Sequence, residues 1–193
     1  MPVLVEQPDL HRYTIEEYHR LVESGGLDED TRVELIDGLV LDMSPRSPQH
    51  ENAVRWLVDW VIDHLDRRRY EQLFAVPLTL GGSEPEPDVA IVARAAPRLC
   101  HPSEALLVIE VALRSRNRDL RVKPVVYAAG VAEYWVVDLE RRCVVVHRDA
   151  TEHGYRRVRS VVSGEPLRCA ALELGLLPTG ELFAAAFAET ASA

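Results

Sequence analysis

Two acidic residues stand where apolar strands would bury them. Glu110 interrupts the apolar run LLVIEVAL, and Asp88 follows Pro87 directly before the apolar run VAIVA. An ionised carboxylate on a buried strand is costly unless a cation or hydrogen bonds compensate it. Carboxylate oxygens are also the ligands that Mg²⁺ prefers. The pair therefore predicts a shared divalent cation, the alternative being two acids that are solvated or paired with arginine at strand ends.

Lysine is nearly absent from this chain, and the single lysine is a second chemical signal. Of 22 lysine and arginine residues, only Lys123 is a lysine. A compact ammonium fits beside a water molecule and a phosphate, whereas the planar guanidinium of arginine is larger and stays protonated. Lys123 is therefore a candidate for a defined task at a reacting centre, the alternative being an ordinary surface lysine at a helix start.

Residues 113–123 form a short basic stretch inside an acidic protein. The formal net charge of −9 argues against a protein that coats nucleic acid through its overall field, but it leaves room for a local phosphate site. The candidates for phosphate contacts are Arg114, Arg116 and Arg118. The alternative for these arginines is a solvated charged face.

The N-terminal part of the chain shows clear local signals. Thr14 and Glu17 form a capping-box pattern at the start of a short helix that ends at Gly25-Gly26. Asp37-Gly38 predicts a two-residue hairpin with a strand on each side. Glu34 falls on the first of these strands.

A long helix and three extended segments are expected next. Ser47-Pro48 predicts the helix start, because serine caps a helix and proline suits its first position. The helix is expected to end near residues 67–69 and carries His50 in its first turn. The extended segments are residues 73–80, 88–93 and 105–112. The nearly uniform apolar runs within the last two favour central strands covered on both faces.

The second half of the chain continues the alternation of helix and strand. A helix is expected from about Asp119 to Ala129, where Gly130 stops it. Strands are expected at residues 133–138, 143–148 and 155–162, then a short helix in LPTGELFAAAFAE and a frayed tail in ETASA. Tyr127 and the tryptophans are expected to pack in the core. The predicted class is α/β with an α+β-like mixed sheet.

Several segments, in this order, resemble a known family. The pieces RVELIDG, MSPRSPQHE, EPDVAIV, LLVIEV and DLRVKPVVYAAGVAEYWVVD resemble the Uma-two family of restriction-endonuclease-like proteins, in the PD-(D/E)XK nuclease superfamily. The resemblance runs from about Tyr13 to Arg148 and more loosely to Phe183. It implies a restriction-endonuclease-like core with flanking helices and hydrolysis of phosphodiester bonds with Mg²⁺ or Mn²⁺. Nucleic acid is the implied partner, with DNA the expected substrate.

The resemblance also assigns roles by position. Pro87-Asp88 matches the PD of the motif and Glu110 the following acid, and these two with the carbonyl of Val111 are expected to hold the metal. The usual motif lysine comes two residues after the acid, where this chain has Ala112. The family takes its lysine from the following helix, and Lys123 is the matching position. Lys123 is expected to orient a water molecule and to offset charge on the phosphorus.

Two further polar residues match the family. Glu34, in ELIDG, reaches the metal through water in this reading, or is a surface acid on the hairpin. His50 lines the pocket, or is a helix residue with no catalytic task.

The chain also departs from the family. It reads Ala112-Leu113-Arg114-Ser115 where the family usually has a Ser-Pro-Ser motif, and Pro124 follows the candidate lysine. Because proline disfavours a helical conformation in the preceding residue, Lys123 is expected at the mouth of the helix and not within it. These departures favour a second hypothesis, a catalytically silent nucleic-acid-binding or dimerisation module. The retained Asp88, Glu110 and Lys123 favour the nuclease.

Length and composition set the remaining expectations. The 193 residues predict one domain, with a core at about residues 13–148 and a C-terminal strand and helix extension at residues 149–193. With 47% apolar and 27% charged residues, the composition excludes a disordered chain. No apolar run reaches the roughly 18 residues of a membrane span, and the N-terminus lacks the pattern of a signal peptide, so a cytoplasmic protein without a membrane partner is expected. A homodimer is left open.

The cysteines exclude two further classes of protein. Cys100, Cys143 and Cys169 are odd in number and show no paired spacing. They are expected to be buried reduced thiols, with neither a structural zinc nor a redox pair.

Overall fold

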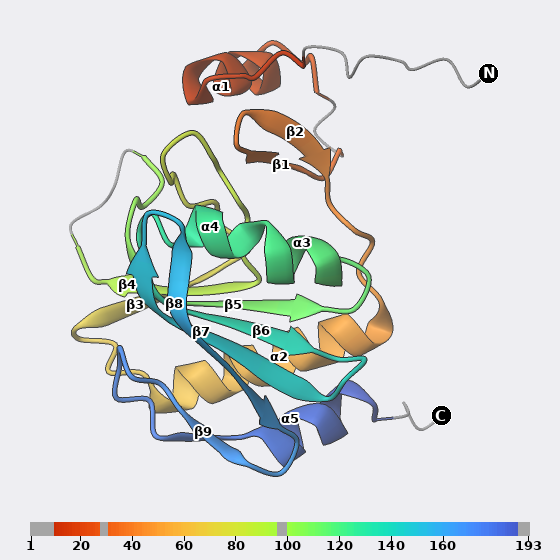
Figure 1. Ribbon diagram of the computed structural model, residues 1–193, viewed down its shortest axis with the longest axis vertical. Coiled ribbons are helices and arrows are strands. Elements are labelled where there is room, and N and C mark those ends of the chain that lie inside the picture. The colour runs from red at the N-terminus through yellow and green to blue at the C-terminus, as the bar shows by residue number, and fades with distance from the viewer. Residues whose placement is uncertain (1–9, 28–30, 96–99, 189–193) are drawn as a thin grey trace.

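The computed structural model describes residues 10–27, 31–95 and 100–188, and its centre is a six-stranded mixed sheet (Figure 1). The strand order is β3-β4-β5-β6-β7-β8, in which β5 and β6 run parallel and the other neighbours run antiparallel. The predicted mixed α/β class is therefore confirmed. The strands are β3 (Tyr70–Phe74), β4 (Val89–Ala93), β5 (Ala105–Ala112), β6 (Val131–Asp138), β7 (Cys143–Thr151) and β8 (Gly154–Val162).

Different helices cover the two faces of the sheet (Figure 1). One face packs against a long helix and the C-terminal helix, and the other against two short helices that connect β5 to β6. A connection of this kind is needed because parallel strands cannot be joined by a tight turn. The helices are α2 (Pro48–His64) and α5 (Thr179–Ala186) on the first face, and α3 (Arg116–Arg121) and α4 (Lys123–Tyr127) on the second.

The alternation of side chains along β5 decides which face its acid occupies. Ile109 and Val111 pack in the core on the α2 side, whereas Val108 and Ala112 pack on the α4 side. Successive strand residues point to opposite faces, so Glu110 lies on the α4 side with Val108 and Ala112. Apart from Leu106 and Ala93, every residue of β4 and β5 is buried, as their apolar runs predict.

The predicted helix at residues 119–129 is instead two short helices that meet at Val122. The proline at position 124 has no backbone N–H, so it cannot continue the hydrogen-bond ladder of α3. Lys123 lies at the mouth of a helix, as expected, but it is the first residue of α4 and so belongs to the helix, contrary to the expectation from the proline.

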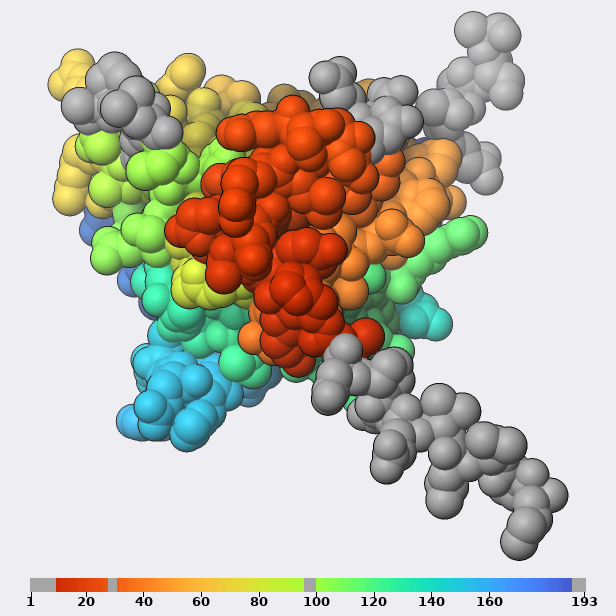
Figure 2. All heavy atoms as spheres, turned by 90° about the horizontal axis from the view of Figure 1, so that it is seen from above, coloured from red at the N-terminus to blue at the C-terminus, as the bar shows by residue number. Residues whose placement is uncertain are grey.

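The N-terminal elements stack above α3 and α4, on the side away from α2 (Figure 1). They are α1 (Ile15–Glu23) and the hairpin of β1 (Val33–Ile36) and β2 (Leu39–Asp42). The capping box of Thr14 and Glu17 is present, and the turn residues Asp37 and Gly38 both have positive φ, 49° and 74°, as a tight hairpin requires. Seen from above, the segment containing α1 lies across the middle of this side (Figure 2).

Two predicted boundaries differ from the structure more than the others. The helix expected to reach residues 67–69 ends at His64, because Leu65 turns to an extended conformation while its side chain stays buried. The strand expected at residues 73–80 is β3, which begins at Tyr70 and ends before Ala75, a residue with φ of 49°. Leu78 and Leu80 lie in the following loop and pack against the α4-side core, so their apolar side chains reflect burial and not a strand.

The C-terminal part adds a small sheet that the sequence analysis did not predict. β9 (Pro166–Arg168) and β10 (Leu176–Pro178) pair antiparallel and lead into α5, which packs against α2. The predicted C-terminal helix is confirmed. The tail ETASA and the N-terminal residues 1–9 lie outside the described residues.

The expectation for the cysteines is confirmed in part. Cys143 and Cys169 are buried free thiols, but Cys100 is exposed. Among the helices of the described ranges, none has the length and apolar character needed to span a bilayer.

A buried carboxylate ties the C-terminal segment to the sheet. Glu133, on β6, is 1% exposed. Its Oε1 accepts hydrogen bonds from Trp135 Nε1 at 2.7 Å and Arg148 Nη2 at 2.7 Å, and its Oε2 accepts from the amide of Ala170 at 2.7 Å. One side chain thus satisfies donors from three segments.

We predict that Glu133→Ala destabilises the protein by about 3–5 kcal/mol, because removing one partner of a buried ion pair leaves the remaining donors unsatisfied. Urea unfolding followed by circular dichroism measures the change. Glu152→Ala is the matched control, since its side chain is 85% exposed in the β7–β8 turn. Equal unfolding midpoints for the two variants would contradict the structural role of Glu133.

Candidate active site

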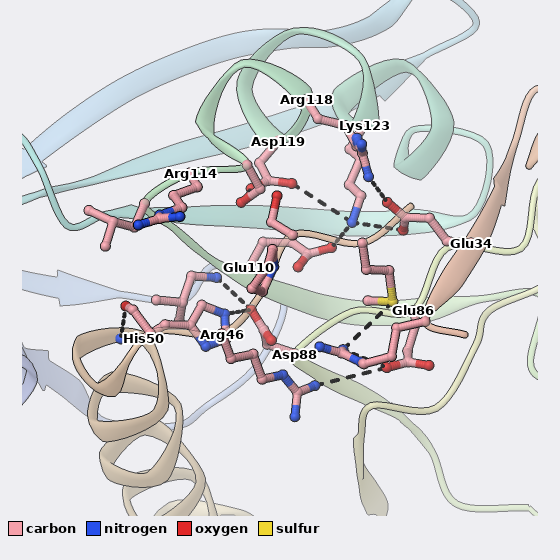
Figure 3. Close-up of a pocket in the computed structure, with 18 residues that line it drawn as sticks. Glu34, Arg46, His50, Glu86, Asp88, Glu110, Arg114, Arg118, Asp119 and Lys123 are labelled. Atoms are coloured by element: carbon pink, nitrogen blue, oxygen red, sulfur yellow. Dashed lines mark hydrogen bonds and ion pairs between the residues drawn. The ribbon is translucent and has the colours of Figure 1, made fainter. Parts of the chain in front are cut away.

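A narrow pocket opens where β5 ends and β4 begins, beneath the β1–β2 hairpin and beside α3 and α4 (Figure 3). Its walls come from several distant segments of the chain, so only the fold brings them together. Carboxylates form the deep part of the pocket, and arginines lie around its mouth. The buried acids are Glu34, Asp88, Glu110 and Asp119, with exposures of 2%, 8%, 5% and 2%.

Asp88 lies directly before β4, facing the end of β5. Its Oδ2 accepts a hydrogen bond from the amide of Val111 at 2.8 Å and lies 3.1 Å from Nε2 of His50. Burial opposes ionisation of Asp88, but the bonds from His50 and Val111 and the charge of Lys123 lower its pKa overall. Asp88 is therefore a carboxylate at neutral pH. His50 lines the same pocket.

Glu110, unlike Asp88, favours its protonated, neutral form. Its Oε1 accepts hydrogen bonds from Lys123 Nζ at 2.7 Å and from the Tyr127 hydroxyl at 2.6 Å. Burial raises its pKa to about 8, and the nearby carboxylates of Asp119, Asp88 and Glu34 act in the same direction against the effect of Lys123. Burial in the pocket thus favours the protonated form of Glu110 even though Lys123 lies beside it.

Lys123 lies at the centre of the acidic cluster and is only 3% exposed. Its Nζ lies 2.7 Å from Glu110 Oε1, 3.0 Å from Glu34 Oε2 and 3.8 Å from Asp119 Oδ1. Burial opposes the charged form, but the three carboxylates outweigh it and raise the pKa of Lys123. The lysine is a buried ammonium and not a surface residue at a helix start.

Glu34 reaches the pocket from the hairpin. Its Oε1 accepts a hydrogen bond from Arg118 Nη1 at 3.1 Å, while its Oε2 faces Lys123. Arg118 also donates to the carbonyl of Asp42 at 2.8 Å. Glu34 is therefore no surface acid, and these contacts hold the hairpin against α3 and α4.

The three predicted phosphate contacts are separated by the structure. Arg114 is exposed at the pocket mouth, and Arg118 lines the pocket while bound to Glu34. Arg116 does not line the pocket, because its Nε donates to the buried Asp138 at 2.6 Å. That ion pair fixes the start of α3 to the end of β6. Arg116 is a structural residue here.

The sequence analysis missed several residues of the site. Asp119 was expected only as a helix start, yet it is buried beside Lys123 and accepts a hydrogen bond from the Ser115 hydroxyl. Burial is the main cause of its raised pKa. Tyr127 does pack in the core, as predicted, but it also donates to Glu110. The spacing of Asp119, Lys123 and Tyr127 by four residues was the signal available, because it places them on one side of a helix.

The pocket contains oxygen donors of the kind that could hold a divalent metal ion. Asp88 and Glu110 both line the same hollow, and burial is the main cause of the raised pKa of Glu110. Val111 lines the same pocket, and its carbonyl is the candidate for a third oxygen. Within residues 10–27, 31–95 and 100–188, no group of three or more histidine, cysteine, aspartate or glutamate side chains is arranged around one metal position. Two carboxylates and one carbonyl suit Mg²⁺ or Mn²⁺, ions that keep several waters.

We predict a pH effect on the metal-free protein from the state of Glu110. The unfolded chain has the ordinary glutamate pKa of 4.5, and the folded protein holds Glu110 at about 8. The folded state therefore binds this proton more tightly than the unfolded state does. The stabilisation from the bound proton is complete below the unfolded pKa of 4.5 and is lost as the pH rises through the folded pKa of about 8. In EDTA, the unfolding free energy of the wild type should fall between about pH 5 and about pH 8 relative to Glu110→Gln, as measured by urea unfolding. Parallel pH curves for the two proteins would contradict this assignment.

Comparisons with known proteins agree with this fold. Residues 15–179 match the sequence pattern of the Uma2 family, which is described as "putative restriction endonuclease". A solved structure of a putative nuclease of family DUF820, from Anabaena variabilis ATCC 29413, is similar with a TM-score of 0.70 and 14% identity, covering 91% of this chain and 99% of that one. At that identity the similarity shows the fold alone, and it confirms the expected nuclease-like core.

Other comparisons add less. The type IIG restriction endonuclease BpuSI shows a similarity with a TM-score of 0.40 and 12% identity, covering 76% of this chain and 17% of that one. No curated protein matches the chain. The family match spans most of the sequence, from the start of α1 to the start of α5. The chain therefore belongs to the Uma2 family of restriction-endonuclease-like proteins.

Proposed function

We propose that this protein is a metal-dependent nuclease that hydrolyses phosphodiester bonds of nucleic acid, with DNA as its substrate. The observation that carries the proposal is the position of its single lysine. The Nζ atom of Lys123 lies 2.7 Å from Glu110, inside a pocket that also contains Asp88. Family membership supports a nuclease activity, and the geometry supports which residues perform it.

Asp88, Glu110 and the carbonyl of Val111 would hold the metal ion. The backbone N–H of Val111 donates to Asp88. The N–H and C=O groups of one strand residue point toward the same neighbouring strand, so the carbonyl of Val111 also points toward Asp88. When bound, Mg²⁺ or Mn²⁺ binds a phosphate oxygen and lowers the pKa of a water molecule.

The remaining residues hold and charge the site. Lys123 orients the attacking water and offsets the negative charge that develops on the phosphate, since its ammonium stays protonated among the carboxylates. Glu34 fixes Lys123 from the hairpin side at 3.0 Å. His50 orients Asp88, and Tyr127 orients Glu110, each through one hydrogen bond.

The departures from the family pattern weigh less against activity once the contacts are known. Pro124 directly follows Lys123, yet Nζ still reaches both Glu110 and Glu34. Ser115, in the segment that lacks the usual serine motif, donates a hydrogen bond to Asp119.

The activity test incubates the protein with supercoiled plasmid, linear DNA, single-stranded DNA and RNA, each with Mg²⁺ or Mn²⁺ and each with EDTA. Cleavage of DNA that needs the metal ion is the expected result. No cleavage of any substrate would favour the alternative, a catalytically silent nucleic-acid-binding module.

We predict that Mg²⁺ or Mn²⁺ stabilises the wild type, because binding to the native state alone contributes about 2.7 kcal/mol at about a hundredfold excess over Kd. Differential scanning fluorimetry should show a rise in melting temperature for the wild type and none for Asp88→Asn or Glu110→Gln. Glu152→Gln, an exposed acid at the other end of the sheet, should respond like the wild type. Equal shifts in all four proteins would place the metal elsewhere.

We also predict that Lys123→Arg keeps the fold and the metal-dependent melting shift but lowers the cleavage rate by about a hundredfold, as loss of one electrostatic group at a reacting centre does. The guanidinium is larger and forked, so it cannot occupy the same point between Glu34 and Glu110. Plasmid cleavage under single-turnover conditions measures the rate.

The matched control is the reverse exchange at an exposed neighbour. Arg121→Lys, at the end of α3, changes the same functional groups outside the pocket and should leave the rate unchanged. A Lys123→Arg rate within a few fold of the wild type would remove this lysine from the reaction.

A further inference from the structure

Two arginines that the proposed chemistry does not use lie at the mouth of the pocket. Arg32 directly precedes β1, and Arg46 lies two residues before α2. Both turn toward one carboxylate oxygen of Glu86, which precedes the metal-site residue Asp88 by two positions. The Nη2 atoms lie 3.5 Å (Arg32) and 3.9 Å (Arg46) from Glu86 Oε1. Figure 3 shows Arg46 and Glu86 beside Asp88.

We propose that Arg32 and Arg46 form a binding site for a backbone phosphate of the nucleic acid, and that Glu86 occupies this site when no nucleic acid is bound. The site rests on the proposed nuclease function and deepens it. Its ligand is a phosphate next to the one that is cleaved. Glu86 acts as an internal competitor for that phosphate.

The contacts with Glu86 leave most of the binding capacity of the two arginines unused. Both distances exceed those of a normal hydrogen bond. One oxygen atom serves two guanidinium groups, each of which carries five N–H donors arranged to bind a phosphate bidentately. Within the described residues, the other contact of the Arg32 side chain is a weak one, to the sulfur of Met43 at 3.6 Å. Half-exposed ion pairs of this kind contribute little stability, so a phosphate can replace the carboxylate.

The charge distribution of the pocket favours a phosphate at this place. The deep part contains four buried acidic side chains, of which Asp88 is ionised, so it does not favour a further anion. At the mouth, two arginines face one acid, which leaves net positive charge in a protein of formal charge −9. Arg114 lies on the α3 side of the same pocket. A nucleic-acid strand can therefore contact arginine on both sides of the carboxylate cluster.

A second hollow continues from Arg46 along the first turns of α2. It shares Arg46 and His50 with the pocket and is otherwise lined by Glu51, Val54 and Arg55. A strand that leaves the pocket past Arg46 would next meet Arg55, which is exposed. The second hollow therefore indicates the path of the nucleic-acid strand, which would run from the α3 side across the acidic cluster toward α2.

The test measures binding of a fluorescent DNA oligonucleotide in EDTA by fluorescence anisotropy, so that cleavage plays no part. Glu86→Gln keeps the shape of the side chain and removes the competing charge, and it should tighten binding about fivefold. Arg32→Ala and Arg46→Ala should each weaken binding and reduce the slope of log K against log salt by about one unit. Arg114→Ala, across the pocket, should reduce the slope by the same amount.

Combining the substitutions distinguishes the proposed competition between Glu86 and the phosphate from a general effect of protein charge on DNA binding. In the Arg32→Ala, Arg46→Ala background, the gain from Glu86→Gln should disappear, because there is no site left to vacate. Glu152→Gln and Arg156→Ala are the matched controls, since both are exposed at the far end of the sheet and change the charge equally. Neither should alter binding.

A tightening by Glu86→Gln no larger than that by Glu152→Gln, or an equal gain in the arginine-free background, would overturn the proposal. The result is independent of the nuclease assay. If the wild type cleaves nucleic acid while these variants bind normally, the phosphate site is wrong and the nuclease stands. If the variants behave as expected and no metal supports cleavage, the phosphate site stands and the nuclease fails.

Discussion

The pocket depends on the burial of one ammonium group among three carboxylates. Lys123 reaches Glu34 on the hairpin, Glu110 on β5 and Asp119 on α3. Each of these groups alone would be costly to bury, and together they compensate one another. Because the three acids come from distant segments, the same contacts also hold the hairpin and α3 against the sheet. The electrostatic centre of the site is thus part of the packing of the fold.

Lys123 does not fully compensate the burial of the acids around it, so the deep part of the pocket stays acidic. Even with Lys123 charged, burial and its acidic neighbours raise the pKa of Glu110. An anionic phosphodiester could not enter such a cluster unaided. In the proposed function the metal ion supplies the missing positive charge inside, and the arginines of the mouth attract the backbone from outside. The overall charge of −9 is therefore no obstacle, since attraction is needed only at the mouth.

Local sequence signals predicted the local structure well, and long-range contacts explain what they missed. The capping box at Thr14, the Asp37-Gly38 turn and the Ser47-Pro48 helix start each involve neighbouring residues, and all are confirmed. The limits of β3, and the pairing of β9 with β10, depend on partners elsewhere in the chain. Arg116 shows the same limit within the site, because nothing near it in sequence indicates that it binds Asp138, 22 residues away. The acids at positions 88 and 110 could be found because a charge in an apolar run is visible in one segment alone.

In the proposed function, a lysine at the start of a helix does the task that the usual motif gives to a lysine on the strand. In the usual motif the lysine would occupy position 112, which shares a face of β5 with Glu110. Here Ala112 is fully buried on that face, in the same core as Tyr127 of α4. A small residue at position 112 leaves room for a side chain that descends from the helix above, and Lys123 opens α4 with its Nζ at Glu110. A second buried ammonium at position 112 would have to share the same acids, so a lysine at one position makes a lysine at the other unfavourable. The alanine and the helix lysine are therefore one arrangement, and the proline at position 124 is compatible with it because the first turn of a helix needs no donor from that residue.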